Sequence, residues 1–300
     1  MQHVLISGGT GFIGKALIDY LLDHYPQVQL TVLVRSMQAL KTKDRVHYCL
    51  WDVDKNYISE DVPANIDTVI HLAGANIAEK RWTKKRKAVL LRSRTESGAL
   101  LSRWVQEKGS AVKTFVSASA IGFYGQGDEG QIFTEQDKAG TDFLASVCVA
   151  WEASTRPLSR MGIRVVWLRT GLVLHPDGGM WKALKPAFAF RIAPRFASGK
   201  QLFSWIGLHD LLALYAFAAE QTGIEGPINA VAPYPSTQID LSKTLLKKQS
   251  PPSFVFPIPE FFLRVALGEL AIELIKNAAV SAEKIERHGF KFSASHLSDL

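Results

Sequence analysis

Three glycines stand three residues apart at Gly8, Gly11 and Gly14, directly after the strand-like run Val4–Ser7. In a strand–turn–helix unit, the first permits the tight turn and the second lets the backbone approach a pyrophosphate. The third lets the helix pack close to the sheet. Backbone N–H groups at the start of that helix then face the anion, at the positive end of the helix dipole. The alternative is an ordinary turn whose glycines serve packing alone. The predicted phosphate-binding residues are Gly8, Thr10, Gly11, Phe12, Ile13 and Gly14.

Arg35 and Ser36 follow a β-branched run at 28–34 that we expect to be the second strand. In dinucleotide folds an acidic residue at this place usually holds the ribose 2′-hydroxyl. A carboxylate would repel a 2′-phosphate, whereas a guanidinium can pair with one through two hydrogen bonds. Arg35 therefore predicts NADP(H) rather than NAD(H), with a solvated arginine at a strand end as the alternative. Asp52, after the third predicted strand, is either an adenine-edge residue or a plain turn aspartate.

Strand and helix patterns alternate through the first two-thirds of the chain, which predicts a parallel sheet covered on both faces. The fold class is therefore α/β, a Rossmann-type doubly wound parallel sheet with a smaller C-terminal substrate region. The predicted strands are 4–7, 28–34, 46–50, 68–73, 114–117 and 163–169, with 227–231 as a further candidate. The predicted helices are 15–24, 84–106, 142–161 and 208–220.

Regular alternation loosens after residue 171, which suggests a division of the chain there. We expect 1–171 to form the dinucleotide-binding domain, with the strand at 227–231 returning to it. Residues 172–300 then form the substrate region. Within it, five aromatic residues are either pocket walls or, for most of them, core: Trp181, Phe188, Phe190, Phe203 and Trp205. The Pro-rich segment 250–259 is expected to be a linker or turn.

The bulk composition is that of a folded protein. The 300 residues are 47% hydrophobic and 21% charged, enough to fill a sizeable core. Cys49 and Cys148 give neither a disulfide framework nor a metal-ligand spacing, so we expect no metal and a reducing, cytoplasmic setting. A strand begins within four residues of the N-terminus, and prolines and charges interrupt the apolar stretch 254–275. We therefore expect no signal peptide, no membrane span and a soluble protein.

A formal net charge of +7 raises the question of a nucleic-acid partner. Lys and Arg are scattered along the chain apart from one cluster at 80–94, into which Trp82 is interleaved. No familiar nucleic-acid motif accompanies it. We expect most of this cluster to be a solvated helix face. The charge then favours a phosphate-rich small molecule and no nucleic acid.

Several short motifs in a fixed order resemble the extended short-chain dehydrogenase/reductases. More narrowly, they are similar to the "epimerase family" branch of nucleoside-diphosphate-sugar epimerase homologues. The similarity spans the chain, and 250–292 resembles that branch's own C-terminal module. The motifs are the glycine loop 8–14, His71-Leu72-Ala73-Gly74, the segment 117–125, Arg81-Trp82-Thr83, Ser93-Arg94, Ala150-Trp151-Glu152, Leu168-Arg169-Thr170-Gly171, Pro176-Asp177-Gly178-Gly179, Ser204-Trp205-Ile206 and Gly226-Pro227-Ile228-Asn229.

This resemblance implies an NADP(H)-binding Rossmann domain with a smaller region closing over a substrate cleft. It places Arg94 near the cofactor crevice, where its guanidinium could contact a phosphate. Arg169 ends a predicted parallel strand, so its charge is expected to open onto the same crevice. The further cofactor-binding candidates are Leu72, Ala73, Gly74, Arg94, Ser117, Arg169 and Gly171.

The catalytic pattern departs from the family. Extended short-chain enzymes use Tyr-x-x-x-Lys, in which the lysine lies one helical turn from the tyrosine and lowers its pKa. Here Cys148 and Glu152 occupy those two places. A cation beside a phenol favours the phenolate, but a carboxylate beside a thiol disfavours the thiolate. Tyrosine-driven chemistry therefore cannot be carried over.

Four residues remain as catalytic candidates. Ser119, or Ser117 in a shifted register, falls where the family's substrate-polarising hydroxyl stands, and Tyr124 would line the pocket. Cys148 could transfer a proton as a thiol, and Glu152 could act as a base if burial raised its pKa. In the alternative, Ser119 satisfies backbone groups, Cys148 is a small buried hydrophobe, and Glu152 only hydrogen-bonds ribose or solvent.

The sequence thus predicts an NADP(H)-binding oxidoreductase or epimerase-like enzyme acting on a small polar substrate, sugar- or nucleotide-linked. A catalytically silent NADP(H)-binding sensor or scaffold is the alternative, and the missing Tyr and Lys favour it. The oligomeric state is left open, a homodimer included.

Overall fold

An eight-stranded sheet forms the centre of the computed structural model, which describes residues 1–38, 40, 42–248 and 254–300. Its strands are β1 (His3–Ser7), β2 (Gln29–Val34), β3 (Val46–Asp52), β4 (Tyr57–Ile58), β5 (Thr68–His71), β6 (Thr114–Ala120), β8 (Arg164–Thr170) and β13 (Gly226–Ala230). Their order across the sheet is β13-β8-β6-β5-β1-β2-β3-β4. The pairs are parallel except β3 with β4.

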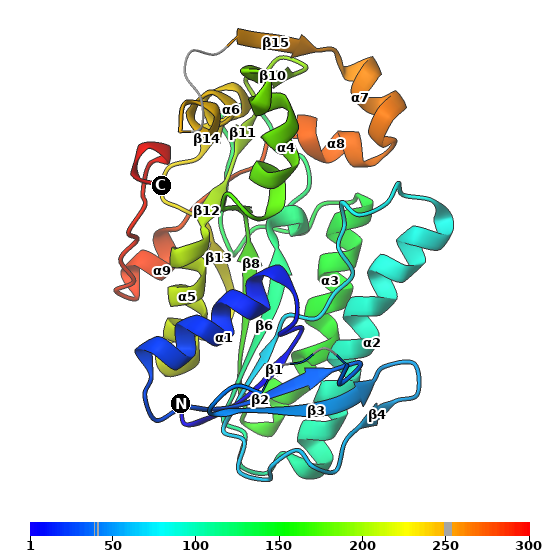
Figure 1. Cartoon of the computed structure of the whole chain (residues 1–300), viewed down its shortest axis with the longest axis vertical. Coiled ribbons are helices and arrows are strands. Elements are labelled where there is room, and N and C mark those ends of the chain that lie inside the picture. Colours follow the sequence, from blue (N-terminus) through cyan, green and yellow to red (C-terminus); the bar gives the residue numbers. More distant parts are fainter. Residues whose placement is uncertain (39, 41, 249–253) are drawn as a thin grey trace.

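Helices cover both faces of this sheet (Figure 1). The covering helices are α1 (Phe12–His24), α5 (Leu208–Glu220), α2 (Lys84–Lys108) and α3 (Phe143–Thr155). Alternate residues of β1 show the two layers, because Val4 and Ile6 join the core under α1 and α5 while Leu5 joins the core under α2. The Rossmann-type α/β fold expected from the alternation is confirmed.

The two helices on the α2 face begin at clear capping residues. Thr83 accepts a hydrogen bond from the Arg86 N–H at 3.1 Å, and Asp142 accepts one from the Ala145 N–H at 3.0 Å. The helix predicted over 142–161 is α-helical only as far as Thr155, and its last six residues form a 3₁₀ helix. The chain tightens into the 3₁₀ helix η2 (Arg156–Met161) after α3, since Pro157 has no N–H with which to continue the α-helical bonding.

The remaining elements form a smaller lobe at the carboxyl end of the sheet (Figure 1). They are η1 (Ile121–Phe123), β7 (Ile132–Phe133), β9 (Leu172–Leu174), α4 (Gly179–Ala189), β10 (Ile192–Phe196), β11 (Leu202–Phe203), β12 (Trp205–Gly207), β14 (Ser236–Thr237), α6 (Gln238–Lys247), β15 (Phe254–Ile258), α7 (Glu260–Leu267), α8 (Leu270–Ile275), β16 (Ala279–Val280), α9 (Glu283–Arg287) and η3 (Leu297–Asp299). Among the described residues, every helix is either too short or too polar to span a bilayer.

Two expectations for this lobe can be compared with the structure. Of the five aromatic residues considered above, four are buried, namely Trp181, Phe188, Phe203 and Trp205, and Phe190 is exposed. The expected linker at 250–259 was wrong where it can be seen, because 254–258 is strand β15, paired in parallel with β10. Its alternating Phe and Val favour a strand despite Pro257. Residues 250–253 lie outside the described residues.

Candidate functional site

The glycine loop joins β1 to α1 in a conformation that side chains would block. Gly8 has φ +75°, and a Cβ there would lie 2.8 Å from the Ala73 nitrogen. A Cβ on Gly14 would lie 2.3 Å from the Gly8 carbonyl oxygen. The Gly11 N–H donates to that same oxygen at 3.0 Å, which closes the turn. The loop is thus held tightly against the end of β5, and its outer side is open backbone.

The start of α1 has the chemistry of an anion site. Gly11 is the N-cap, and within the described residues no side chain caps the helix and no acidic residue stands in its first turn. Thr10 and Gly11 are exposed, so the first backbone N–H groups of the helix are open to a ligand. These amides, with the positive end of the helix dipole behind them, suit a diphosphate.

Phe12 links this loop to the smaller lobe. A Cβ on Gly178 would lie 2.1 Å from the Phe12 ring, and the ring of His175 is centred 5.8 Å away. His175 also lines a cavity of about 520 Å³, together with Trp181 and His209. The turn before α4 is therefore built against the glycine loop.

Arg35 and Ser36 lie, exposed, at the carboxyl end of β2. Since β1 and β2 are parallel neighbours, this end borders the glycine loop. The Ser36 hydroxyl accepts a bond from the Gln38 N–H at 3.1 Å. Asp52 accepts one from the Lys55 N–H at 3.1 Å, and this bond is the main cause that holds the Asp52 pKa below its usual value. Asp52 thus lies in a tight turn, which is the arrangement expected of a turn aspartate.

The end of β5 carries a buried imidazole that sequence reasoning did not single out as functional. His71 is fully buried, with Nδ1 at 2.7 Å from the Ser7 hydroxyl and Nε2 at 3.3 Å from the Ser97 hydroxyl. Burial lowers its pKa to about 3, so the ring is neutral at physiological pH. The sequence feature that could have identified His71 is its place as a histidine at the end of an apolar strand. Leu72, Ala73 and Gly74 follow it directly, and Ala73 packs under Gly8.

Arg94 projects from α2 toward Gly74, in the segment that follows β5. Its guanidinium lies over the Trp151 ring at 4.9 Å, and a Cβ on Gly74 would lie 3.2 Å from its Cζ. Its Nη1 donates to the Leu90 carbonyl at 3.0 Å. Burial lowers the pKa of this arginine, while the neighbouring Cys148 opposes that shift. Arg94 is thus a partly buried cation beside the end of β5.

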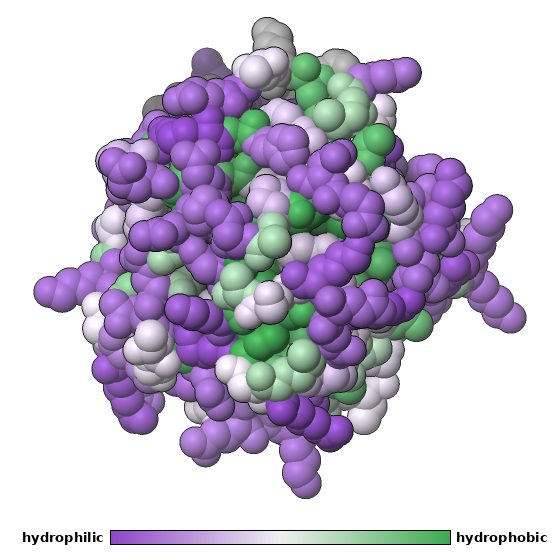
Figure 2. Space-filling model, turned by 90° about the horizontal axis from the view of Figure 1, so that it is seen from below, coloured by the Kyte–Doolittle hydropathy of each residue, from purple (hydrophilic) through white to green (hydrophobic). Residues whose placement is uncertain are grey.

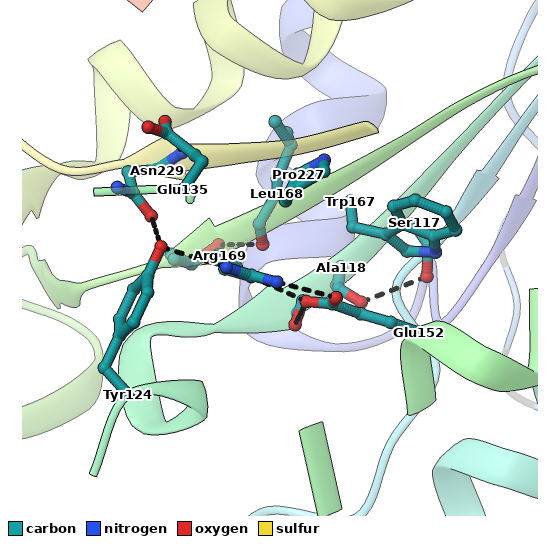
Figure 3. Close-up of polar contacts among 12 residues, drawn as sticks. Ser117, Ala118, Tyr124, Glu135, Glu152, Trp167, Leu168, Arg169, Pro227 and Asn229 are labelled. Atoms are coloured by element: carbon teal, nitrogen blue, oxygen red, sulfur yellow. Dashed lines mark hydrogen bonds and ion pairs between the residues drawn. The ribbon is translucent and has the colours of Figure 1, made fainter. Parts of the chain in front are cut away.

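Glu152 is the centre of a buried polar network, which Figure 3 shows in close-up. The carboxylate accepts bonds from Arg169 Nε at 2.8 Å and Arg169 Nη2 at 3.0 Å. The Ser119 hydroxyl donates to Glu152 Oε1 at 2.8 Å. The side chains of Arg169 and Glu152 are 4% and 2% exposed. The expectation that Arg169 opens onto the crevice was wrong, because α3 supplies a carboxylate that draws the guanidinium inward.

Tyr124 continues the network on the other side of Arg169. Its hydroxyl accepts a bond from Arg169 Nη1 at 3.0 Å and donates one to Asn229 Oδ1 at 2.6 Å. Burial raises the pKa of Tyr124 to about 12, although Arg169 opposes the shift. Asn229 is fully buried and was missed as a site residue, although it ends the Gly-Pro-Ile-Asn motif. Its amide nitrogen donates to the Ser281 carbonyl.

Cys148 lies buried on α3 one turn before Glu152. Burial raises the pKa of its thiol to about 12, and the Glu152 carboxylate adds to the shift. The contribution of Glu152 has the direction expected for a carboxylate in the lysine place. Both halves of the altered Tyr-x-x-x-Lys pattern are therefore committed, Glu152 to an ion pair and Cys148 to a protonated thiol.

Two further candidates have clear structural surroundings. Ser117 is fully buried, and its hydroxyl donates to the Ala118 carbonyl at 3.0 Å. A Cβ on Gly171 would lie 2.7 Å from the Ser204 carbonyl oxygen, so this glycine permits close packing of the two lobes. The structure therefore joins Ser119, Tyr124, Glu152 and Arg169 in one hydrogen-bonded network, while the Ser117 hydroxyl bonds to the Ala118 carbonyl instead. Their roles in binding or catalysis stay predictions.

Three of the eight cations in the basic cluster at 80–94 form ion pairs with neighbouring carboxylates. Arg86 pairs with Glu79, Lys87 with Glu269, and Arg92 with Glu96. Trp82 is buried, and its indole N–H donates to the Ile77 carbonyl at 2.8 Å. The aromatic side chain that would stack on a nucleobase is therefore part of the core.

Comparisons with known proteins place the chain in a family. Residues 4–230 match the model of the NAD dependent epimerase/dehydratase family. The chain belongs to this family. Residues 258–299 match a domain of unknown function, DUF1731, which overlaps the C-terminal module expected from the sequence. An "epimerase family protein" of Mycobacterium bovis, Mb2239, is 36% identical over 99% of this chain and 95% of its own length.

Solved structures of similar proteins agree with the fold. The human epimerase family protein SDR39U1, solved with NADPH, is 26% identical, covers 99% of this chain and 97% of its own, and has a TM-score of 0.87. A UDP-glucose 4-epimerase from Thermus thermophilus, solved with NAD, has a TM-score of 0.77 at 19% identity over 99% of this chain and 96% of its own. At 19% identity, the similarity to the Thermus thermophilus enzyme supports the fold alone.

Proposed function

We propose that this family member binds NADP(H) and acts as an epimerase-like oxidoreductase on a small polar substrate, sugar- or nucleotide-linked. The observation that carries the proposal is the glycine loop, whose crowded inner side and open helix-terminal amides fit a diphosphate. The exposed guanidinium of Arg35 beside it favours the 2′-phosphorylated cofactor. The NADPH in the similar human protein supports the same choice.

The residues present suggest how each part of the cofactor would be held. Amides of the glycine loop would bind the diphosphate, and Arg35 with Ser36 the 2′-phosphate. Leu72, Ala73 and Gly74 would border the nicotinamide half, and Arg94 beside Gly74 would supply positive charge there. When bound, the dinucleotide supplies reversible hydride transfer.

A cavity near Phe12 is a candidate ligand site in the smaller lobe, and its lining is separate from Ser119, Tyr124, Cys148 and Glu152. Leu174 and Trp181 give it apolar walls, while His175, His209 and Lys248 give it polar ones. This mixture suits a small ligand with both a ring and charged or hydroxyl groups. The cavity belongs to the region after residue 171 that the sequence assigns to substrate.

A second candidate function has a specific observation in its favour. Both oxygens of Glu152 are bonded, and burial keeps Cys148 protonated and Tyr124 un-ionised. None of these groups is poised as a base near neutral pH. This favours a catalytically silent protein that binds NADP(H) as a sensor or scaffold.

Isothermal titration of the purified chain with NADPH and NADH tests cofactor choice. We expect Arg35→Ala to weaken NADPH binding roughly 10- to 150-fold, since hydrogen bonds to charged groups contribute about 1.5–3 kcal/mol, and to leave NADH unchanged. Arg92→Ala, which removes an exposed arginine paired with Glu96, is the matched control. Equal affinities for the two cofactors in the wild-type chain would refute the preference.

Loss of the reduced-nicotinamide absorbance during a screen of carbonyl compounds and nucleotide sugars tests for chemistry. Turnover by the wild-type chain that Glu152→Gln or Cys148→Ala reduces supports the enzyme. An epimerase returns the hydride and leaves this absorbance unchanged, so NMR of the nucleotide sugars is followed as well. If NADPH binds tightly, no substrate class oxidises it and no nucleotide sugar is epimerised, the silent candidate is favoured instead.

A further inference from the structure

A cavity in the smaller lobe is separate from the residues assigned to the cofactor. It has a volume of about 520 Å³ and is lined by the turn into α4, the start of α5 and the segment 293–300. Its inner wall is buried and mainly apolar, and includes Leu174, Trp181, Leu208 and Ala294. Its rim is exposed and polar, and includes His209, Lys248, Ser293 and Asp299. The described residues that line it include none that was assigned above to NADP(H) or to catalysis.

The wall of this cavity contains a hydrogen-bond donor without an acceptor. Trp181 is 5% exposed, and its indole N–H has no partner among the described residues. Trp205 shows the usual arrangement, because its indole N–H donates to the Tyr234 carbonyl at 3.1 Å. Buried polar groups are nearly always satisfied, so an orphaned donor at a cavity indicates a missing acceptor. Trp181 therefore points to a ligand that carries an oxygen acceptor.

The start of α5 adds further donors to the same cavity. This helix follows the N-cap Gly207, and within the described residues no side chain caps it. Gly207, Leu208 and His209 all line the cavity. The first N–H groups of a helix have no acceptor inside it, and they carry the positive end of the helix dipole. Together with the Trp181 indole, these amides suit a carboxylate.

The cavity also has acidic residues, which disfavour a ligand that is only an anion. Asp210, in the first turn of α5, is buried and accepts three hydrogen bonds from Ser293 and Ala294. Asp299 is exposed on the rim. Lys248 supplies a positive charge to the same rim. Because the lining carries both signs of charge beside an apolar wall, the matching ligand has an anionic group, a cationic group and an apolar body.

A second hollow, at the other end of the molecule, differs in this respect. It has a volume of about 460 Å³ and lies at the amino ends of β1 and β2, with His3 and Asn65 in its lining. Among the described residues of that lining, none has an orphaned buried donor. Figure 2 views the molecule from this end and shows a mostly hydrophilic surface, with apolar residues confined to a central strip. The cavity of the smaller lobe is therefore the better site for a ligand with an apolar body.

We propose that this cavity binds a free α-amino acid with an aromatic side chain. The carboxylate of the amino acid accepts hydrogen bonds from the Trp181 indole and the first amides of α5, and its ammonium group lies beside Asp299. Its ring packs against Leu174 and Pro176, which line the cavity. The volume lies within the range of about 300–1,000 Å³ that is usual for small-molecule sites. The proposal does not rest on the proposed function, because the two sites share no assigned residue.

Isothermal titration of the full chain with L-phenylalanine, with and without saturating NADPH, tests the proposal. We expect saturable binding to one site per chain in both conditions. Two analogues each lack one charge: 3-phenylpropionate has no ammonium group, and phenethylamine has no carboxylate. Both should bind at least about tenfold more weakly, because hydrogen bonds between charged groups are the strong ones.

Two variants locate the site. Trp181→Phe keeps a ring and removes the indole N–H, and should weaken L-phenylalanine binding about tenfold or more. Trp104→Phe is the matched control, because Trp104 is a buried tryptophan of α2 that lies outside the cavity lining. Asp299→Asn, on the exposed rim, should weaken L-phenylalanine and leave 3-phenylpropionate unchanged. The melting temperature of each variant shows whether it folds.

Four results would overturn the proposal. The first is the absence of saturable binding of L-phenylalanine, L-tyrosine and L-tryptophan. The second is 3-phenylpropionate binding as tightly as L-phenylalanine, which contradicts the zwitterion. The third is loss of amino-acid binding at saturating NADPH, which would place the amino acid in the cofactor crevice. The fourth is wild-type affinity in both folded variants, Trp181→Phe and Asp299→Asn. A chain that binds L-phenylalanine and not NADPH would refute the proposed function alone.

Discussion

Replacing Glu152 by alanine removes the carboxylate that neutralises Arg169. The two side chains are 2% and 4% exposed, so water cannot take the place of the lost oxygens. Removing one partner of a buried ion pair costs about 3–5 kcal/mol, because the other charge stays buried without compensation. Arg169 keeps its bond to the Tyr124 hydroxyl and lies 3.4 Å from the centre of the Phe123 ring, which offsets part of that cost.

We therefore expect Glu152→Ala to lower the free energy of unfolding by about 3 kcal/mol. The measurement is urea unfolding followed by far-UV circular dichroism at neutral pH. The matched control is Glu152→Leu/Arg169→Met, which replaces the whole pair by apolar side chains of similar size. Its stability should lie within about 1–2 kcal/mol of the wild type, well above that of the single variant.

A loss below about 1 kcal/mol for Glu152→Ala would mean that Arg169 finds water or another partner. The Glu152 and Arg169 side chains would then be separated, or reached by water, in solution. A double variant less stable than the single one would show that the ion pair contributes net stability. The first of these results would also free Glu152 for the catalytic role that its bonding otherwise opposes.

Three further predictions concern the loop, the buried imidazole and the thiol. Gly14→Ala should lower NADPH affinity at least about tenfold, since its Cβ would lie 2.3 Å from the Gly8 oxygen. Gly223→Ala, where the Cβ meets nothing within 4 Å, should leave titration calorimetry unchanged. His71 has its pKa lowered from 6.5 to about 3, so its stabilising contribution is present above pH 6.5 and is lost as the pH falls toward 3. His71→Gln should therefore flatten the decline in urea midpoint between pH 6.5 and 4.5, and a decline as steep as in the wild type would contradict the assignment. Burial raises the pKa of Cys148 to about 12, so the stability that its protonated thiol contributes is constant below pH 9 and decreases from there to pH 12. Ellman's reagent at pH 8 should react with Cys148 only after urea unfolding, and Cys49→Ser isolates its signal.

The first half of the fold could be predicted because its signals are local. A few residues of sequence are enough to predict the apolar strand before Gly8, the helix after it and the β-branched second strand. Arg35 could be interpreted for the same reason, since its meaning depends only on its place at a strand end.

The buried network could not be predicted because it depends on contacts between distant elements. Glu152 was a candidate base on α3 and Arg169 a crevice residue on β8. Only the packing of that helix on that strand reveals that each neutralises the other. Asn229 reaches Tyr124 across 105 positions of chain, which no periodicity encodes. The short strands of the smaller lobe gave too few residues for a pattern.

The position of β13 decides where this chain can be cut. This strand is supplied after residue 225, yet it pairs with β8 at the border of the central sheet. A truncated product ending at 171 would leave the backbone amides and carbonyls of β8 unpaired along that border. An unpaired edge strand can pair with the same edge of another molecule, so the fragment should aggregate and precipitate when expressed by itself. During synthesis on the ribosome, the nucleotide-binding half must likewise wait for more than fifty later residues before its sheet is complete.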